Sequence, residues 1–286
     1  MIDAGPAHTA RIHGVAMLTA AHVPHATHDA GALLAWILNT EVGLLPMAAE
    51  LDQRAAEQYA KALERRAQRE PLQHIIGTAW FAGLPIAVGP GVFIPRPETE
   101  LLVDWILRAL PSHAPVVHDL CAGSGAIALA IKAARPDARV YAVENDRQAL
   151  QWLRRNVREL RLDVTIVEAD ATDPCWASEL PRADAITCNP PYIPDGLELE
   201  AEVTHFDPAP ALWAGADGLD TIREIVPLLN RAMHADSALA IEHHDDHQDD
   251  LLDLLRGSRF DKVEGHRDLA GRQRFATAVC AYDWIL

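Results

Sequence analysis

The sequence lacks the long apolar run with which a chain crosses a membrane. No stretch of its 286 residues approaches the roughly 18–20 consecutive apolar residues that a spanning helix needs. The N-terminus carries His8, Arg11 and His13 without a sustained apolar segment after them, which argues against a signal peptide. With 49% hydrophobic and 23% charged residues, the composition is that of a soluble globular chain with one large or two ordinary domains.

Cysteine and basic residues are also scarce. The four cysteines, at positions 121, 175, 188 and 280, lie far apart without the paired spacing of a metal site, so we expect reduced thiols in a cytoplasmic protein. Only 25 Lys and Arg stand against 41 Asp and Glu, giving a net charge of −16. This balance argues against broad binding to nucleic acid, which needs a basic surface, and favours a protein partner with positive patches.

Histidine is frequent enough to raise the question of a metal. The run His243-His244-Asp245-Asp246-His247 follows a predicted strand that ends at Glu242. Contiguous loop residues rarely converge on one ion, so the sequence favours a solvated loop at the edge of a sheet. We expect no metal site here, and we assign Glu242 no catalytic role.

The first 78 residues are predicted to form a small helical domain. Helices are expected over residues 10–21, from Asp29 to Leu38 and from Met47 to Arg69, with Asp29 as a candidate N-cap. The third helix carries Leu51, Ala55, Tyr59 and Leu63 on one stripe with charges opposite, which is typical of an amphipathic helix.

Short apolar pieces broken by glycine and proline follow, and they predict a β-hairpin connector over residues 79–98. At its end, Arg96 and Glu98 fit either a structural ion pair or cap, or a role in shaping the mouth of a site. Thr99 could cap the next predicted helix, over residues 101–110.

Residues 99–286 alternate between strand and helix patterns. The predicted strands are 116–120, 139–143, 164–167, 183–188, 238–242, 263–266 and 275–282, and the predicted helices between them are 125–134, 147–160, 221–233 and 249–255. This alternation predicts an α/β domain with a largely parallel sheet covered by helices on both faces.

A glycine-rich turn follows the first of these strands. The residues Asp119-Leu120-Cys121-Ala122-Gly123-Ser124-Gly125 lead directly into a helix. Glycines let the backbone approach a ligand closely, and a helix N-terminus offers N–H donors. The turn alone is weak evidence, because a nucleotide dehydrogenase would have a similar one, although the full G-x-G-x-x-G pattern is missing here.

Two acids end the next two strands. Glu144 ends the strand 139–143 about 20 residues after the glycines, where a carboxylate can accept hydrogen bonds from both ribose hydroxyls of a nucleoside. Asp170 follows the third strand and is placed to reach an adenine amino group, with Asp173 as a neighbouring candidate. Taken alone, Glu144 would more often be a helix cap than a ligand, but its position after the glycines favours ribose binding, whereas Asp170 fits a strand cap as well as a ligand.

The fourth strand stops abruptly at Asn189-Pro190-Pro191-Tyr192. Neither proline can continue a central strand, so the tetrapeptide stands at a carboxyl end, where open α/β sheets bind ligands. It offers an amide, a carbonyl held in place and an aromatic face, a set that suits a planar –NH2 or amide group. A simple proline-rich turn is the alternative.

Together and in this order, these elements resemble the Rossmann-like S-adenosylmethionine-dependent methyltransferases. The Asn-Pro-Pro-Tyr form is similar to that of enzymes that methylate planar nitrogens: adenine or cytosine amino groups and glutamine amides. A narrower resemblance covers nearly the whole chain and points to the protein glutamine-N5 methyltransferases that modify peptide-chain release factors (the HemK/PrmC type). It is carried by Glu70–Gly77, Phe93–Leu102, Asp119–Ala128, Asn189–Ile193, Phe206–Leu212, Gly215 and Asp217–Leu219.

The resemblance implies methyl transfer from S-adenosylmethionine to the glutamine of the Gly-Gly-Gln motif in release factors, with the helical domain recognising that substrate. It implies a catalytic role for Asn189, Pro190 and Tyr192, with Pro191 beside them at the substrate. The implied cofactor contacts are Cys121, Ala122, Gly123, Ser124, Gly125, Glu144, Ala171 and Asn189, to which the strand pattern adds Asp170. An amide whose two hydrogens are accepted by the Asn189 oxygen and the Pro190 carbonyl would be oriented for transfer.

The chain departs from the family pattern at a few positions. Cys121 and Ala122 stand where Gly and Thr are usual, Glu144 replaces Asp, and Ala171 replaces an aromatic residue near the adenine, which would weaken cofactor affinity. The alternatives are a ribosomal-protein glutamine methyltransferase, which lacks the Arg-Pro-Glu-Thr-Glu form of residues 96–100, a DNA amino-methyltransferase, and a non-catalytic docking module. A DNA enzyme would need a basic recognition region. We expect a monomer.

Overall fold

The chain folds into two compact units in the computed structural model, which describes residues 2–47 and 50–281. One unit takes the chain as far as Thr78 together with Leu199–Phe206, and the other takes Ala79–Glu198 and the chain from Asp207 onward. Within the described ranges, no helix is long and apolar enough to cross a membrane.

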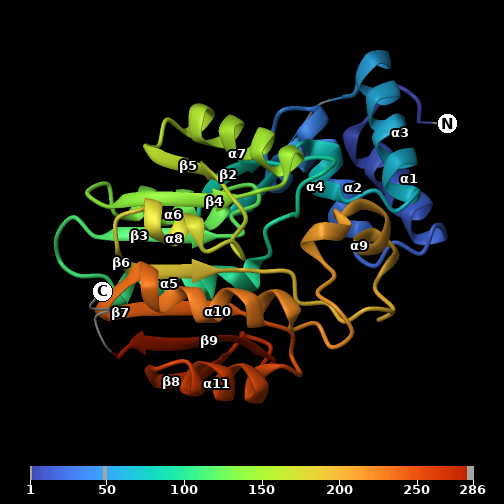
Figure 1. The fold of residues 1–286 in the computed structure, drawn as a ribbon. Coiled ribbons are helices and arrows are strands. Elements are labelled where there is room, and N and C mark those ends of the chain that lie inside the picture. Colours follow the sequence, from blue (N-terminus) through green and yellow to red (C-terminus); the bar gives the residue numbers. More distant parts are fainter. Residues whose placement is uncertain (1, 48–49, 282–286) are drawn as a thin grey trace. The chain divides into compact units, whose positions relative to one another are not determined.

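The first unit is helical. Its elements are α1 (Ala7–Ala20), α2 (Ala26–Ile37), the 3₁₀ helix η1 (Val42–Met47), α3 (Gln53–Ala67), α4 (Leu72–Ile76) and α9 (Ala201–Phe206) (Figure 1). Helix α3 begins at Gln53 rather than at the predicted Met47, because the Asp52 side chain accepts a hydrogen bond from the Ala55 amide at 2.7 Å and caps the helix there. The predicted stripe of α3 is buried at Tyr59 and Leu63.

A buried charge cluster ties α9 to the helical unit. Asp29 is not the predicted cap: it lies inside α2, where it accepts a hydrogen bond from Arg66 Nε at 2.7 Å. The same guanidinium donates to Glu202 of α9 at 2.9 Å, and Arg69 contacts that carboxylate at 3.0 Å. Because the side chains of Asp29 and Arg66 are almost inaccessible to water, each needs the other's charge.

The second unit contains a β-hairpin and a seven-stranded sheet. The hairpin pairs β1 (Thr78–Phe81) with β2 (Leu84–Ala87). The sheet has the order β5-β4-β3-β6-β7-β9-β8. Its strands are β3 (Val116–Leu120), β4 (Arg139–Glu144), β5 (Val164–Glu168), β6 (Ala183–Cys188), β7 (Met233–Glu242), β8 (Phe260–Arg267) and β9 (Gln273–Cys280). The five strands from β5 to β7 are parallel, whereas β9 runs antiparallel to both β7 and β8.

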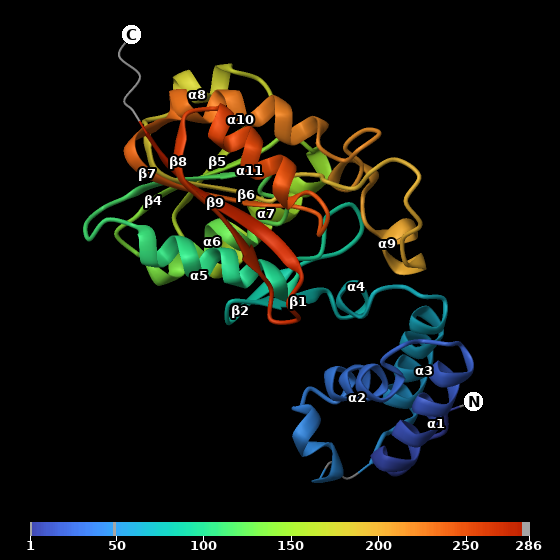
Figure 2. The same cartoon turned by 90° about the horizontal axis from the view of Figure 1, so that it is seen from below.

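Helices cover both faces of this sheet, as the alternation of the sequence predicts. One hydrophobic core lies under α5 (Glu100–Ala109), α6 (Ala126–Ala134) and α7 (Arg147–Leu160). The other lies under α8 (Cys175–Glu179), α10 (Asp220–Ala232) and α11 (Gln248–Gly257), and Figure 2 shows the two layers on opposite sides of the strands. The 3₁₀ helices η2 (Pro97–Thr99) and η3 (Ala209–Ala211) complete the unit. The short helices α8 and α9 have no clear sequence signal and were not predicted.

The strand order reverses at β3. The chain moves outward from β3 to β4 and β5, then returns to place β6 on the other side of β3. Open α/β sheets bind ligands beyond the carboxyl ends of the strands at such a switch point. The fold therefore brings together the segments that follow β3 and β6.

Candidate active site

The glycine turn and the proline-rich segment follow adjacent strands. Leu120 at the end of β3 pairs with Cys188 at the end of β6, so Cys121 and Asn189 leave the sheet at the same level. The sequence predicts these segments separately, and the parallel register places them side by side at the switch point.

The turn after β3 has the backbone of a ligand-binding loop. Cys121, Gly123 and Gly125 have φ values of 56°, 56° and 83°, in the left-handed region that glycine adopts without strain. A side chain at Gly125 would collide with Leu153 of α7, so this glycine lets helix and turn pack closely. A Cβ at Gly123 would meet no atom within 4 Å, so open space lies above that peptide. The turn thus leaves room for a ligand against its backbone.

Glu144 joins the end of β4 to this turn. Its Oε2 accepts a hydrogen bond from the Gly123 amide at 2.7 Å, and its Oε1 accepts from the amides of Asn145 and Asp146 at 2.9 and 2.8 Å. Burial raises the pKa of this carboxyl, and the three amides oppose that shift. Because Oε1 already accepts two bonds, Oε2 is the oxygen with capacity for a further donor such as a ribose hydroxyl.

The predicted adenine-side residues lie after β5. Asp170 is exposed, and its Oδ1 accepts from the Thr172 amide and hydroxyl at 2.9 and 2.7 Å, while Oδ2 accepts from Asn145 at 3.0 Å. Ala171 is buried, and its carbonyl accepts from the indole of Trp176 on α8 at 2.9 Å. Asn145 therefore links Glu144 and Asp170, because its amide donates to the first and its side chain to the second. Trp176 holds the loop after β5 through its hydrogen bond to the Ala171 carbonyl.

The Asn189–Tyr192 segment is fixed at both ends. Pro190 is buried, and Asn189, Pro191 and Tyr192 are partly exposed. Beyond it, the Ile193 amide donates to the Leu212 carbonyl at 2.7 Å. The segment thus presents partly exposed polar groups from a backbone that is held in place.

Tyr192 makes a contact that the sequence does not reveal. Its hydroxyl donates to Oε1 of Glu242, at the end of β7, at 2.9 Å. The other oxygen of Glu242 accepts from Thr99 at 2.6 Å, so Thr99 stands at the N-terminus of α5 without capping it. Burial raises the pKa of Tyr192 well above its ordinary value, and the neighbouring carboxylate adds to this effect. Tyr192 therefore stays protonated at neutral pH.

Other predicted polar residues have structural partners. Arg96 pairs with Asp207 at 2.6 Å and Glu98 with Arg272 at 3.3 Å, which favours the ion-pair interpretation of both. The expectation of a solvated histidine loop is wrong for His243 and His247, which are both buried; His243 Nδ1 donates to the His244 carbonyl at 2.8 Å.

The position of His243 directly after the buried strand β7 explains why its side chain is buried. Helices cover both faces of β7, and the chain is still inside when it leaves the strand at residue 243. Burial lowers the pKa of His243 to about 4, so it is neutral. Among the residues that the structure describes, no three His, Cys, Asp or Glu side chains are grouped to hold a metal ion, and none of the four cysteines takes part in a disulfide bond.

Two family models match the chain. The PrmC N-terminal domain matches residues 9–77, and the methyltransferase small domain matches residues 86–206. A release factor glutamine methyltransferase of Mycolicibacterium smegmatis is 43% identical over 266 residues, which are 92% of this chain and 94% of that protein. One from Coxiella burnetii is 36% identical over 219 residues, covering 76% and 77% of the two chains.

Solved structures share the fold at low identity. A methyltransferase from Pyrococcus furiosus aligns with a TM-score of 0.53 and 15% identity, covering 76% of this chain and 99% of that one. The 16S rRNA N2 G1207 methyltransferase of Thermus thermophilus, in complex with AdoMet and guanosine, aligns with a TM-score of 0.52 and 20% identity over 71% of this chain and 49% of that one. These two likenesses establish the Rossmann-like methyltransferase fold.

Proposed function

The chain belongs to the release factor glutamine methyltransferase family, and from that premise we propose that it methylates the Gly-Gly-Gln glutamine of a peptide-chain release factor at N5, with S-adenosylmethionine as donor. The observation that carries the proposal is the register of β3 and β6, which sets the glycine turn beside Asn189–Tyr192. A methyl donor on the turn and an amide on that segment would then be neighbours.

The residues of the switch point fit S-adenosylmethionine. The open space above Gly123 admits a ligand against the backbone, and Glu144 keeps capacity for a ribose hydroxyl on Oε2. Asp170 and Ala171 stand after the next strand, where the adenine would lie. When bound, the cofactor supplies an electrophilic methyl group on its sulfonium. The chain contributes the contacts of Cys121–Gly125, Glu144, Asp170, Ala171 and Asn189.

The acceptor amide needs orientation because its nitrogen lone pair is delocalised into the carbonyl. The Asn189 side-chain oxygen and the Pro190 carbonyl would each accept one of its two N–H groups, which points the nitrogen and stabilises positive charge on it as the new bond forms. Both acceptors belong to a segment held by the Ile193–Leu212 bond, so little reorganisation is required.

Tyr192 has a positioning task and no acid–base task. Its hydroxyl already donates to Glu242, and its raised pKa keeps that proton in place. The ring would stack on the acceptor amide with Pro191 beside it. No strong base is required, because the methylated nitrogen is acidic enough to lose its proton to water after transfer.

The test uses labelled S-adenosylmethionine, the purified chain and two release factors: the native one, and one with the Gly-Gly-Gln glutamine replaced by alanine. Label on that glutamine alone, located by peptide mass mapping, supports the proposal. Cofactor binding without label on the release factor, followed by label on a ribosomal protein or on DNA, identifies the corresponding alternative. If the chain does not bind S-adenosylmethionine at all, the result supports the alternative of a non-catalytic docking module.

Asn189→Ala should lower kcat by about 100-fold or more, since removing one preorganised polar group at a developing charge has that order of effect. Cofactor affinity and thermal stability should largely persist. The measurement is methyl transfer at saturating release factor beside calorimetric titration with S-adenosylhomocysteine. Near-normal turnover would refute the role of Asn189.

We further propose that the enzyme acts as a monomer without nucleic acid. The net charge of −16 supports the second point, because phosphate backbones would be repelled. Sedimentation of the chain alone, and of the chain mixed with duplex DNA, tests both points. A dimer or a shifted DNA boundary would contradict them.

A further inference from the structure

The buried carboxylate of Glu242 lies next to the Asn189–Tyr192 segment and has no role of its own in the mechanism proposed above. Glu242 ends β7, and its neighbour Ile241 pairs with Cys188 of β6, so Glu242 is level with Asn189. Its exposed fraction is 1%. A charged group so deep in a protein is costly unless hydrogen bonds and charges compensate it.

The compensation comes from both sides of the carboxyl group. Thr99 donates to Oε2 at 2.6 Å and Tyr192 donates to Oε1 at 2.9 Å. Burial raises the pKa of Glu242, and the hydrogen bonds from Thr99 and Tyr192 and the nearby charge of Arg274 oppose that shift. Since both neighbours donate, the ionised carboxylate, an acceptor on each oxygen, is the form that satisfies them.

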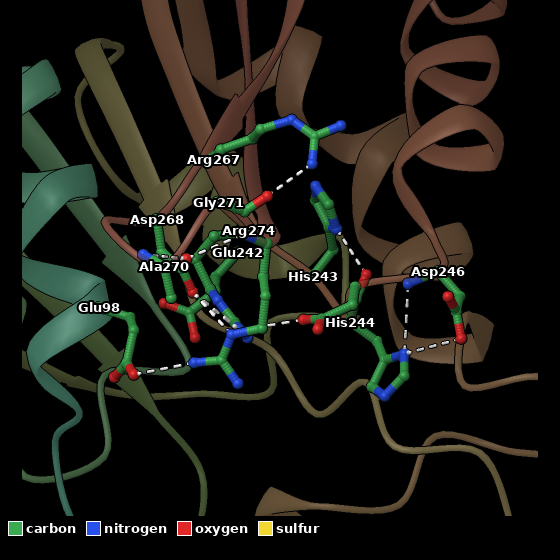
Figure 3. Close-up of polar contacts among 12 residues, drawn as sticks. Glu98, Glu242, His243, His244, Asp246, Arg267, Asp268, Ala270, Gly271 and Arg274 are labelled. Atoms are coloured by element: carbon green, nitrogen blue, oxygen red, sulfur yellow. Dashed lines mark hydrogen bonds and ion pairs between the residues drawn. The ribbon is translucent and has the colours of Figure 1, made fainter.

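Arg274 is itself held by acids. Its guanidinium contacts Asp245 at 3.0 Å and Asp268 at 3.3 Å, and Figure 3 draws it among Glu242, Asp268 and the histidine loop. The side chain is only 12% exposed. The positive charge of Arg274 therefore favours the ionised form of Glu242, whose Oε1 accepts the hydrogen bond from the Tyr192 hydroxyl.

A hydrogen bond at the far end of a tyrosine restrains the whole ring. With the hydroxyl tied to Glu242, the ring cannot swing about its χ1 and χ2 bonds without breaking a bond to a charged acceptor. The ring face is thereby set relative to Asn189 and Pro190 in the same segment. The hydrogen bond from Thr99 to Glu242 connects the start of α5 to the end of β7. The hydrogen bond from Tyr192 to Glu242 is the one that reaches the Asn189–Tyr192 segment.

We propose that Glu242 is a positioning residue for the methyl acceptor: it holds the Tyr192 ring at the orientation in which the substrate amide stacks on that ring while its two N–H groups donate to Asn189 and Pro190. This inference rests on the proposed glutamine methylation. It assigns Glu242 no contact with substrate. Its effect passes through Tyr192.

The test is a double-mutant cycle with Glu242→Gln and Tyr192→Phe. Gln keeps the size of Glu242 but removes its charge, and Phe keeps the ring but removes the hydroxyl. We expect each single variant to lower kcat by about 10- to 100-fold, the range expected for a reactant misplaced by about 1 Å. The dissociation constant of S-adenosylhomocysteine should change less than about threefold, because the cofactor residues are untouched. The double variant should be no slower than the slower single variant.

Glu98→Gln is the matched control. It removes a carboxylate that contacts Arg272 beside the same cluster, and it has no bond to Tyr192. Its kcat should stay within about threefold of the unmodified protein.

Two results would overturn the inference: an unchanged kcat in Glu242→Gln, or effects that multiply in the double variant. Should Glu242→Gln not fold, an unchanged kcat in Tyr192→Phe overturns it as well, and a lowered one supports it. Failure of the proposed function itself is distinguishable, because the unmodified chain would then leave the release factor without label.

Discussion

Replacing Glu144 by alanine tests the predicted cofactor site most directly. Its carboxylate is buried, and it accepts the Gly123 amide on Oε2 at 2.7 Å and two further amides on Oε1. Alanine removes the proposed acceptor for a ribose hydroxyl and at the same time removes the acceptor of the Gly123 amide. Both changes act on the same ligand.

The magnitude follows from the hydrogen bonds that are lost. A hydrogen bond to a charged group contributes about 1.5–3 kcal/mol. One ribose hydroxyl without its acceptor therefore weakens binding by about 10- to 150-fold, since each 1.4 kcal/mol is about tenfold in Kd. Greater freedom of the glycine turn adds to this loss, so we expect a total of about two to three orders of magnitude.

Glu168→Ala is the control, because Glu168 is the register partner of Glu144 on the adjacent strand β5. Glu168 is exposed and pairs with Arg154 at 2.7 Å on the surface, so its loss should leave Kd unchanged. The assay is calorimetric titration of each variant with S-adenosylhomocysteine, beside thermal unfolding without ligand to exclude a folding defect. A folded Glu144→Ala variant whose Kd stays within about threefold of the unmodified chain would refute the ribose assignment.

Two further predictions concern stability. Arg66→Met should lower the free energy of local opening in the helical unit by about 3–5 kcal/mol, because the buried Asp29 loses its guanidinium partner and keeps only its contact with the exposed His28. Hydrogen exchange of α2 and α3 measures it. Arg65→Met, which breaks only the exposed pair with Glu70, should cost under about 1 kcal/mol. Burial raises the pKa of Asp119 from 3.8 to about 7. A raised pKa means that the folded state holds the proton more tightly, so this group's contribution to stability falls as the pH rises from about 4 to about 7. Asp119→Asn should therefore gain stability relative to the unmodified chain across that window, by at most about 4 kcal/mol. Urea unfolding at pH 5, 6, 7 and 8 measures the difference, and parallel curves would contradict the prediction.

The sheet and its strand ends could be predicted from the sequence because local patterns specify them. The alternation of apolar segments gives the strands, and glycine and proline mark their ends. These signals lie within a few residues of each other, so one sequence is enough to recognise them. The pairing of β3 with β6, which brings Cys121 and Asn189 together, is known only from the structure.

The interactions that support the site could not be predicted in this way. Tyr192 and Glu242 are 50 residues apart and Thr99 and Glu242 are 143 apart, and only the folded sheet brings them together. His243 belongs to a run that looks polar throughout, yet it is buried because β7 is a central strand. Asp29 has the residue type of a helix cap, but it lies within the first turn of α2, and its carboxylate accepts a hydrogen bond from Arg66 instead.

The path of the chain between the two units restricts how the protein can be rebuilt. Because Leu199–Phe206 belongs to the helical unit, the backbone passes from one unit to the other near residues 78, 198 and 206. Deleting the first 78 residues would thus not yield a self-sufficient catalytic fragment: α9 would lose Arg66 and Arg69, its ion-pair partners, in the excursion that directly follows the Asn189–Tyr192 segment. A chimera that exchanges the helical unit between relatives must therefore exchange two separate segments, residues 1–78 and 199–206. If only the first segment were exchanged, Glu202 would face helices from the other protein.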